Sequence, residues 1–282
     1  MNQRRDYAAE SPDDFQRVRL SLLGRMTETI TTGRLADLGV GTGWRCLEIG
    51  AGDGSVAGWL AGRVGPEGRV VATDPDPLVL FGHGWPNLEV RRHDILEHDL
   101  EEAHYDLVHC RFVLMQLADP MRALARMAAA VRPGGWLIVE EADFGFSGAG
   151  DPWHPRAAKF ERNWRALHTD PLSDVSIDRA FGRRLPALVE GLGFREVDHE
   201  EEWLIAQGGD PAARYCRMSH QLVRGQAVAS GVLTGADFEE LNRAYDDPSF
   251  CFIPFTVVGA WGRAPARPER RRRVQTLATR HT

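Results

Sequence analysis

Three glycines at alternate positions, Gly50, Gly52 and Gly54, follow a short apolar segment that contains one acid, Glu48. Glycine accepts positive φ angles and, because it has no Cβ, it lets a ligand approach the backbone closely. Apolar residues then recur at helical spacing over residues 56–64, so the turn ends at a helix N-terminus with free N–H groups. A strand, a glycine-rich turn and a helix start in this order predict a binding site for a small molecule.

Two other interpretations of glycine runs compete with this one. A dinucleotide-binding turn places its third glycine where this chain has Ser55, so a nicotinamide-dependent dehydrogenase is disfavoured. A second run, Gly39 to Gly43, has similar spacing, but the segment 44–49 that follows it is typical of a strand and not of a helix. We therefore interpret the second run as the turn that leads into the first strand.

An acid, Asp74, ends the next predicted strand, residues 68–74. A carboxylate has two oxygens and can accept hydrogen bonds from both hydroxyls of a ribose. Pro75 follows directly and cannot continue the hydrogen-bonded ladder of a sheet. We expect Asp74 and Pro75 to contact a ribose at this strand end.

Strand and helix patterns alternate through residue 141, which indicates an α/β fold. The expected strands are residues 44–49, 68–74, 87–95, 105–112, 136–141, 194–205 and 250–261. The expected helices include residues 12–30, 113–117, 119–131, 177–192, 210–229 and 234–245. We predict a doubly wound, Rossmann-like, seven-stranded and mostly parallel sheet, whose last strand pairs antiparallel between the fifth and the sixth.

The glycine turn, Asp74, a third strand end at Asp94 and the turn at residues 133–135 occur in an order that resembles class I S-adenosylmethionine-dependent methyltransferases. The segment YDLVHCRFVLMQLADPMRALARMAAAVRPGGWLIVEE, residues 105–141, is similar to bacterial small-molecule methyltransferases related to those of ubiquinone and menaquinone biosynthesis. The resemblance implies S-adenosylmethionine as the cofactor and S-adenosylhomocysteine as its product.

The resemblance also implies roles for single residues. Asp94 is expected to meet the adenine amino group and Ile95 to cover the ring, with an ordinary turn residue as the alternative for Asp94. The backbone carbonyl of Arg111 is expected to receive the methionine amino group, and Gln116 stands where those relatives commonly have histidine. The complete set of expected cofactor-binding residues is Glu48, Gly50, Ala51, Gly52, Gly54, Asp74, Pro75, Asp94, Ile95 and Arg111.

The insertion after the fifth strand, residues 142–176, mixes aromatic residues with glycines and prolines. In this fold class such an insertion usually sets substrate specificity, so we expect a substrate lid that suits an aromatic acceptor. The alternative is an aromatic mini-core under a loop. Its histidines His154 and His168 are the general-base candidates, although methyl transfer needs a base only when the acceptor must lose a proton.

Three ranges describe the expected domain organisation. Residues 1–40 form an N-terminal helical cover, residues 41–264 form the methyltransferase domain, and the basic residues 265–282 form a tail that we expect to be disordered. In class I methyltransferases a leading helix often covers the cofactor, and simple packing of this helix on the sheet is the alternative.

Composition excludes several other classes of protein. The 282-residue chain has a formal net charge of −6, which argues against a protein that wraps nucleic acid. No apolar stretch is long enough for a membrane span, and the four cysteines are too scattered for a disulfide framework or a metal site. We therefore expect a cytoplasmic protein, monomeric or homodimeric, with no nucleic-acid, membrane or metal partner.

These observations predict an enzyme that transfers a methyl group from S-adenosylmethionine to a small molecule, such as an aromatic natural product or secondary metabolite. The alternative is a protein of the same fold that binds the cofactor but catalyses a cyclisation or rearrangement, or only binds its ligand. Turnover to S-adenosylhomocysteine distinguishes the two.

Overall fold

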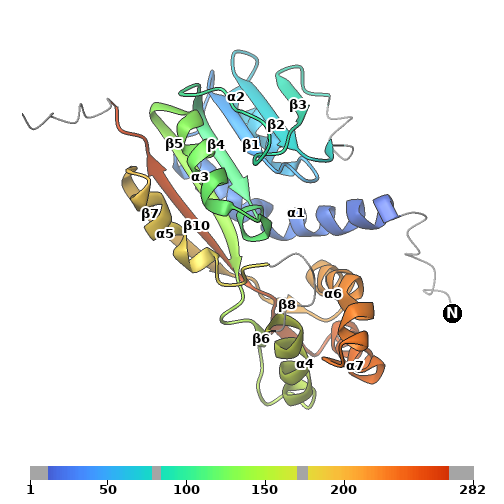
Figure 1. The fold of residues 1–282 in the computed structure, drawn as a ribbon. Coiled ribbons are helices and arrows are strands. Elements are labelled where there is room, and N and C mark those ends of the chain that lie inside the picture. Colours follow the sequence, from blue (N-terminus) through green and yellow to red (C-terminus); the bar gives the residue numbers. More distant parts are fainter. Residues whose placement is uncertain (1–11, 78–83, 170–176, 267–282) are drawn as a thin grey trace, which may run out of the picture.

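The computed structural model of the chain describes residues 12–77, 84–169 and 177–266. Its centre is a seven-stranded sheet in the order β3-β2-β1-β4-β5-β10-β7, in which only β10 runs antiparallel to its two neighbours (Figure 1). The strands are β1 (Arg45–Ile49), β2 (Arg69–Asp74), β3 (Leu88–Arg92), β4 (Tyr105–Arg111), β5 (Val131–Asp143), β7 (Arg195–Trp203) and β10 (Thr256–Arg263). The predicted sheet, including the antiparallel position of the last strand, is confirmed.

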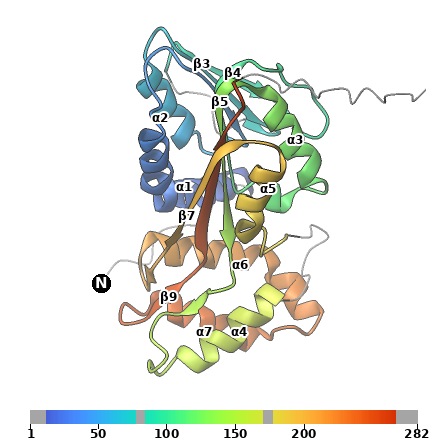
Figure 2. The same cartoon turned by 90° about the vertical axis from the view of Figure 1, so that its left-hand side faces the viewer.

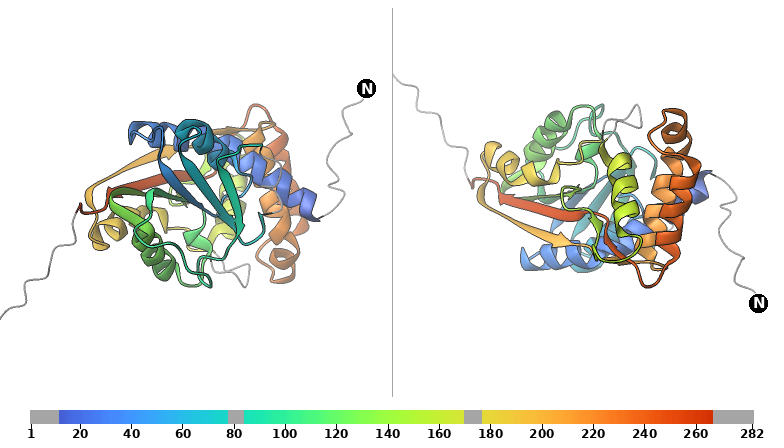
Figure 3. Two further views of the ribbon diagram at one scale, coloured as in Figure 1. Left: turned by 90° about the horizontal axis from the view of Figure 1, so that it is seen from above. Right: turned by 90° about the horizontal axis from the view of Figure 1, so that it is seen from below.

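Helices cover both faces of the sheet because its central strands are buried on both sides. Neighbouring residues of β1 belong to different cores: Cys46 packs with α2 (Ser55–Val64), and Leu47 packs in the core that includes α3 (Pro120–Ala130) and α5 (Leu185–Gly191). Viewed along the vertical axis, α1 and α2 lie on one side of the sheet and α3 and α5 on the other (Figure 3). This doubly wound arrangement brings the ends of β1, β2 and β4 to one edge.

The first helix, α1 (Pro12–Asp37), is longer than predicted and ends just before the run from Gly39 to Gly43. Gly39 and Gly43 have φ angles of 81° and 82°, and the Gly43 N–H donates to the Val64 carbonyl at 2.9 Å. The run therefore forms the turn that leads into β1, as the sequence predicted.

A second, smaller unit lies beyond one end of the sheet (Figures 1 and 2). It combines α4 (Ala157–Thr169), α6 (Pro211–Ala229), α7 (Gly235–Asp246) and a sheet of β6 (Gly148–Ala149), β9 (Cys251–Ile253) and β8 (Ala206–Gln207). These elements share a core rich in aromatic side chains. The predicted insertion thus supplies only α4 and β6, and later parts of the chain complete the unit.

Three predicted elements differ in the structure. Pro254 separates the expected last strand into β9 and β10, since proline has no N–H for the ladder. The expected helix 113–117 is a single 3₁₀ turn, η2 (Leu114–Gln116). The expected helix 177–192 is reduced to a 3₁₀ turn, η3 (Gly182–Arg184), and α5. The segment before them is held at the end of β5, because the Phe144 N–H donates to the Arg179 carbonyl at 3.0 Å.

The predicted N-terminal cover and the predicted basic tail each lie partly outside the described residues. Of the predicted basic tail, residues 267–282 lie outside the described residues. Of the predicted N-terminal cover, residues 1–11 do so as well. Within the described ranges, every helix is too short or too polar to cross a membrane.

Candidate cofactor and acceptor site

The glycine turn after β1 has a backbone that only glycine adopts easily. The φ angles of Gly50, Gly52 and Gly54 are 68°, 56° and 79°. A Cβ built on Gly50 would lie 2.2 Å from Cγ2 of Val113, so any side chain at Gly50 would collide with the loop after β4. Gly54 caps the N-terminus of α2. The turn therefore presents bare backbone at the edge of the sheet.

Asp74 lies beside this turn and is held in place by it. Its Oδ2 accepts the Gly52 N–H at 3.1 Å, and its Oδ1 accepts the Asp76 N–H at 2.8 Å. Burial raises the pKa of Asp74, and these two hydrogen bonds oppose that shift. The carboxylate is thus fixed at the strand end before any ligand arrives.

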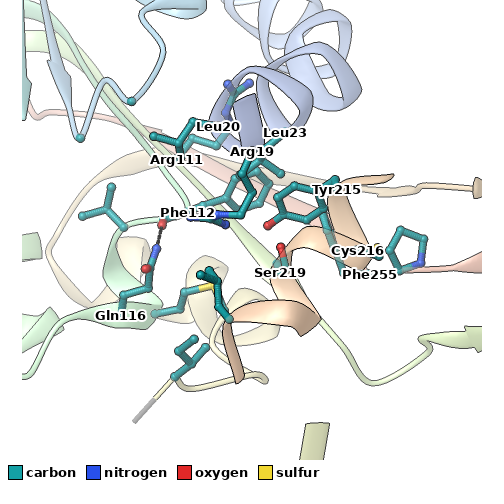
Figure 4. Close-up of a pocket in the computed structure, with 18 of the residues that line it drawn as sticks. Arg19, Leu20, Leu23, Arg111, Phe112, Gln116, Tyr215, Cys216, Ser219 and Phe255 are labelled. Carbon is teal, nitrogen blue, oxygen red and sulfur yellow. Dashed lines mark hydrogen bonds between the residues drawn. The ribbon is translucent and has the colours of Figure 1, made fainter. Parts of the chain in front are cut away.

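One cavity of about 580 Å³ extends from this turn into the aromatic unit. The end of the cavity at the glycine turn, here called the donor end, is lined by Glu48, Gly50, Ala51, Gly52, Asp53, Asp74, Pro75 and Arg111. The end inside the aromatic unit, here called the acceptor end, is lined by residues of α1, α4 and α6 together with Phe144, Arg179 and Phe255. Side chains of α1 (Arg19, Leu20 and Leu23) and of α6 (Tyr215, Cys216 and Ser219) surround it with Phe112 (Figure 4).

The loop after β4 joins the two ends of the cavity. Phe112 has a φ of 57°, an unusual value for a residue with a side chain, and its ring meets that of Phe255 at 5.7 Å. The buried carboxylate of Glu141 accepts the N–H groups of Val113 and Leu114 at 3.0 and 2.6 Å. Burial raises the pKa of Glu141 to about 8, although these N–H groups oppose the shift. Glu141 thereby anchors the loop from behind.

A chain of buried ionic groups lies beneath the donor end. His109 of β4 places Nδ1 2.6 Å from Glu48 Oε2 and Nε2 3.1 Å from Glu140 Oε2. Burial disfavours the charged imidazole, but the two carboxylates outweigh it and raise the pKa of His109 to about 9. Although burial opposes ionisation, His109 and the nearby arginines hold the pKa of Glu140 at about 2. Both ring nitrogens of His109 therefore carry protons and donate to carboxylates.

The first helix is tied into this ionic chain. Arg34 Nη1 donates to Glu140 Oε1 at 2.6 Å, and Thr31 Oγ1 donates to Glu140 Oε2 at 2.5 Å. Arg111, which lines the cavity, donates from Nη1 to Thr31 Oγ1 at 2.8 Å. The position of α1 and the orientation of Glu48 consequently depend on one hydrogen-bonded network.

The acceptor end contains two neutral histidines. His168 stacks on Trp164 with ring centroids 4.4 Å apart, and burial lowers the pKa of His168 to about 4. Its Nδ1 lies 2.7 Å from the Trp164 carbonyl, which can only accept, so Nδ1 carries the proton and Nε2 the lone pair. His220 lies 5.3 Å from His168 between ring centroids, and burial keeps its pKa well below the usual value too.

Several predicted site residues lie elsewhere. Gly54, Asp94 and Ile95 do not belong to the cavity lining within the described residues. The carboxylate of Asp94 accepts the Leu96 N–H at 2.8 Å, as in an ordinary turn, and Ile95 is in the hydrophobic core. Their contact with adenine stays a prediction.

His154 is also away from the cavity. Its Nε2 lies 3.2 Å from Ser249 Oγ, and its ring meets Phe250 edge-on, because the segment before α4 packs on the loop before β9. His154 therefore lies outside the described cavity lining, whereas His168 is part of it, and a base role for either histidine stays a prediction.

Sequence reasoning missed the residues that α6 and α1 bring to the cavity. Tyr215, Ser219 and Leu222 are spaced by four and three positions and so lie on one face of α6. That spacing was a usable signal. The position of Arg179 on the cavity wall and the contacts of His109 with Glu48 and Glu140 had no comparable signal, because only the tertiary fold brings these residues together.

The residues at the donor end fit the cofactor that the family resemblance implies. The glycine turn leaves open backbone, and the half-buried Asp74 has two oriented oxygens beside it for a ribose diol. The carboxylate of Glu48 lines the same end and is held at Oε2 by His109, which suits an ammonium group. These groups match an amino acid and a ribose.

Comparison with known proteins agrees with this geometry. The family model "Methyltransferase domain" matches residues 10–189, which include the sheet through β5, α1 and α4 but not α6 and α7. The methyltransferase str2 of Strobilurus tenacellus is 31% identical over 133 residues, covering 47% of this chain and 48% of that protein. The ubiquinone/menaquinone biosynthesis C-methyltransferase UbiE of Bordetella avium is 32% identical over 125 residues, covering 42% and 48%.

The chain therefore spans about half the length of these curated relatives. Among solved structures, a chain in the complex of the Haloferax volcanii Trm112 methyltransferase activator with a methyltransferase matches with a TM-score of 0.54 and 16% identity, over 93% of this chain and 99% of that one. That likeness concerns the fold. Because the family model covers more than half of its residues, the chain belongs to the methyltransferase domain family.

Proposed function

We propose that this chain transfers the methyl group of S-adenosylmethionine to a small molecule bound at the acceptor end of the cavity. The observation that carries the proposal is continuity: one cavity includes both the glycine turn with Asp74 and the aromatic wall with His168. Its volume of about 580 Å³ lies within the range typical of small-molecule sites. A donor and an acceptor held in one enclosed space gain most of their rate from orientation.

Residues at the donor end would bind the cofactor, and residues at the acceptor end would bind the molecule that is methylated. When bound, the cofactor supplies an activated methyl group on a positively charged sulfur. Glu48 and Asp74 would orient the amino-acid and ribose parts, and the aromatic rings would hold the acceptor and exclude water. We infer an acceptor of the aromatic natural-product or secondary-metabolite type because rings from several elements, including Phe144, Trp164 and Phe255, line that end.

His168 is the candidate general base for an acceptor that must lose a proton. Its Nδ1–H is committed to the Trp164 carbonyl, so Nε2 keeps a lone pair. The lowered pKa of about 4 keeps the ring neutral at physiological pH, so Nε2 can accept a proton, although so low a pKa makes it a weak base. A hydroxyl hydrogen-bonded to Nε2 would give its proton to His168 as its oxygen receives the methyl group.

Calorimetry and mass spectrometry test the proposal. S-adenosylmethionine and S-adenosylhomocysteine should bind with micromolar affinity, whereas NAD should not bind. Ligands that stay bound through purification should be converted to products one methyl group heavier, with equal S-adenosylhomocysteine formed. Cofactor binding without S-adenosylhomocysteine formation would favour the cyclisation or binding alternative instead.

A matched pair of variants tests the base. His168→Gln should lower kcat by about 10²–10⁴-fold at unchanged cofactor affinity. His154→Gln, a histidine of the same insertion that is off the cavity wall, should leave kcat unchanged. Equal kcat values for the two variants would remove His168 from the mechanism.

A further inference from the structure

The cavity is divided by charge as well as by shape. Its carboxylates within the described residues are Glu48, Asp53 and Asp74, and all three belong to the donor end. The acceptor end instead has the guanidinium groups of Arg19 and Arg179. An acceptor pocket with cations and no carboxylate in its described lining has a positive potential that favours an anionic ligand.

Arg179 is one of the two arginines at this end. Its side chain is half-buried, and its Nη2 donates to the Leu167 carbonyl at 3.3 Å. Within residues 12–77, 84–169 and 177–266, no carboxylate forms an ion pair with it. A guanidinium has five N–H donors, so this single contact leaves most of its hydrogen-bonding capacity for a ligand.

Two arginines of the same segment show the contrast. Arg183 is paired with Asp143 through two contacts of 2.5 Å, and Arg184 is paired with Asp178. The side chains of Arg183 and Arg184 are exposed, so water could solvate their charges, and yet each has a carboxylate partner. Partly buried charges are normally compensated, so a cavity-lining arginine that has no carboxylate partner among the described residues favours a carboxylate on the ligand.

The groups around Arg179 do not neutralise it. His168 and His220 are its neighbours on the cavity wall, and the positive charge of Arg179 adds to the burial that keeps the pKa of each histidine low. Burial also lowers the pKa of Arg179 itself. The cluster thus holds one permanent positive charge and two neutral imidazoles, which is a suitable environment for one anion.

We propose that the acceptor is an aromatic carboxylate, with its carboxylate bound by Arg179 and its ring packed among Phe144, Trp164 and Phe255. This proposal rests on the proposed function, because it names the substrate class for the same cavity. A carboxylate matches the planar fork of a guanidinium, which can bind both oxygens at once. The rings supply the apolar contact that a small inorganic anion could not use.

Binding of matched ligands tests the proposal without requiring turnover. The full chain, saturated with S-adenosylhomocysteine, is titrated with 3-hydroxy-2-naphthoate and with its uncharged analogue 3-hydroxy-2-naphthamide, and likewise with 4-hydroxybenzoate and 4-hydroxybenzamide. We expect at least one carboxylate to bind tenfold or more tightly than its amide. Added salt should reduce this preference.

Three variants locate the preference. Arg179→Gln should abolish it, Arg179→Lys should keep part of it, and Arg184→Gln, a paired arginine outside the cavity lining, should keep all of it. The affinity for S-adenosylhomocysteine should stay unchanged in all three. If every amide binds as well as its carboxylate, or if the preference survives in Arg179→Gln, the proposal is wrong. Failure of the proposed function would be seen separately, as absent binding of S-adenosylhomocysteine by the wild type.

Discussion

His109 lies beneath the donor end of the cavity, His168 lines its acceptor end, and the two have opposite protonation states. His109 lies between two carboxylates, and its pKa is raised to about 9. His168 lies against aromatic rings and a backbone carbonyl, and its pKa is lowered to about 4. His109 is fully buried and His168 is half-buried, and burial opposes the charged form of both, so burial alone does not decide the charge of an imidazole. The neighbours decide it.

The different protonation states of His109 and His168 suit different functions, cofactor binding at the donor end and acceptor binding at the acceptor end. At the donor end, the ionic network of Glu48, His109 and Glu140 orders a fixed acceptor of hydrogen bonds for a cationic cofactor. At the acceptor end, aromatic rings, an unprotonated histidine nitrogen and the arginines Arg19 and Arg179 can accommodate a molecule that loses a proton. The predictions that follow test whether the two ends are as different as this comparison states.

The largest effect is expected from removing the imidazolium. His109→Leu leaves Glu48 and Glu140 facing each other in the core without their shared cation, which should lower the free energy of unfolding by about 3–5 kcal/mol. Urea denaturation measures this change in the free energy of unfolding. His199→Leu, on the exposed face of β7, is the control and should change little. A loss below about 1 kcal/mol for His109→Leu would mean that the network does not support the donor end.

Asp74→Ala should have the next largest effect, on binding. Losing an oriented carboxylate that is positioned for ribose should weaken S-adenosylmethionine binding by about 1–3 kcal/mol, roughly 5- to 150-fold. Calorimetry measures the change, and an unaltered circular dichroism spectrum checks the fold. Asp76→Ala is the control, because its side chain is exposed and contacts Arg92 at 3.5 Å. If the two variants exchange behaviour, the ribose contact belongs to Asp76.

The pH dependence of stability sharpens the comparison of the histidines. The folded-state pKa of His109 is raised above its unfolded value of 6.5, so its stabilisation is complete below pH 6.5 and is lost as pH rises through about 9. The stability difference between wild type and His109→Gln should therefore shrink over that window. Comparing the two chains cancels other titrations, including that of Glu141. A difference that is constant from pH 6 to pH 10 would contradict the assigned charge.

His168 should show the opposite sign. Its folded-state pKa is depressed to about 4, so the wild type loses stability relative to His168→Gln as pH falls from 6.5 towards 4. His220 has a depressed pKa for a similar reason and should keep part of this acid dependence in the variant. Denaturation midpoints between pH 4 and pH 7 measure the change. A wild type that gains stability relative to His168→Gln over that range would show that His168 is charged at neutral pH.

The smallest effect is expected from deleting residues 267–282. The last strand, β10, ends at Arg263, so every described element and both ends of the cavity are retained. The free energy of unfolding should change by about 0.5 kcal/mol or less, and cofactor affinity should not change. Calorimetry of the truncated chain is the measurement. Lost cofactor binding, or tight RNA binding by only the full chain, would show that this segment has a function.

The donor end was largely predictable because its signals are local. Gly50, Gly52 and Gly54 need particular backbone angles, and Asp74 ends its own strand, so neither depends on distant residues. Asp94 was harder, because a strand-end acid that closes a turn and one that faces a ligand have the same sequence pattern. The aromatic character of the insertion was predicted, but the residues of α6 that line the acceptor end were not, and the role of the insertion as a lid stays a prediction.

The amino-acid sequence by itself determined the order of strands and helices, the glycine turn and the acid beside it, because periodicity and backbone preference act over a few residues. Only the tertiary structure decided that α6 completes the acceptor end, that His154 is directed away from the cavity, and that Arg179 is left without a described carboxylate partner. It also decided the charges of His109 and His168. Those properties arise from contacts between distant segments, and the free energy of a buried charge depends on those contacts and not on sequence neighbours.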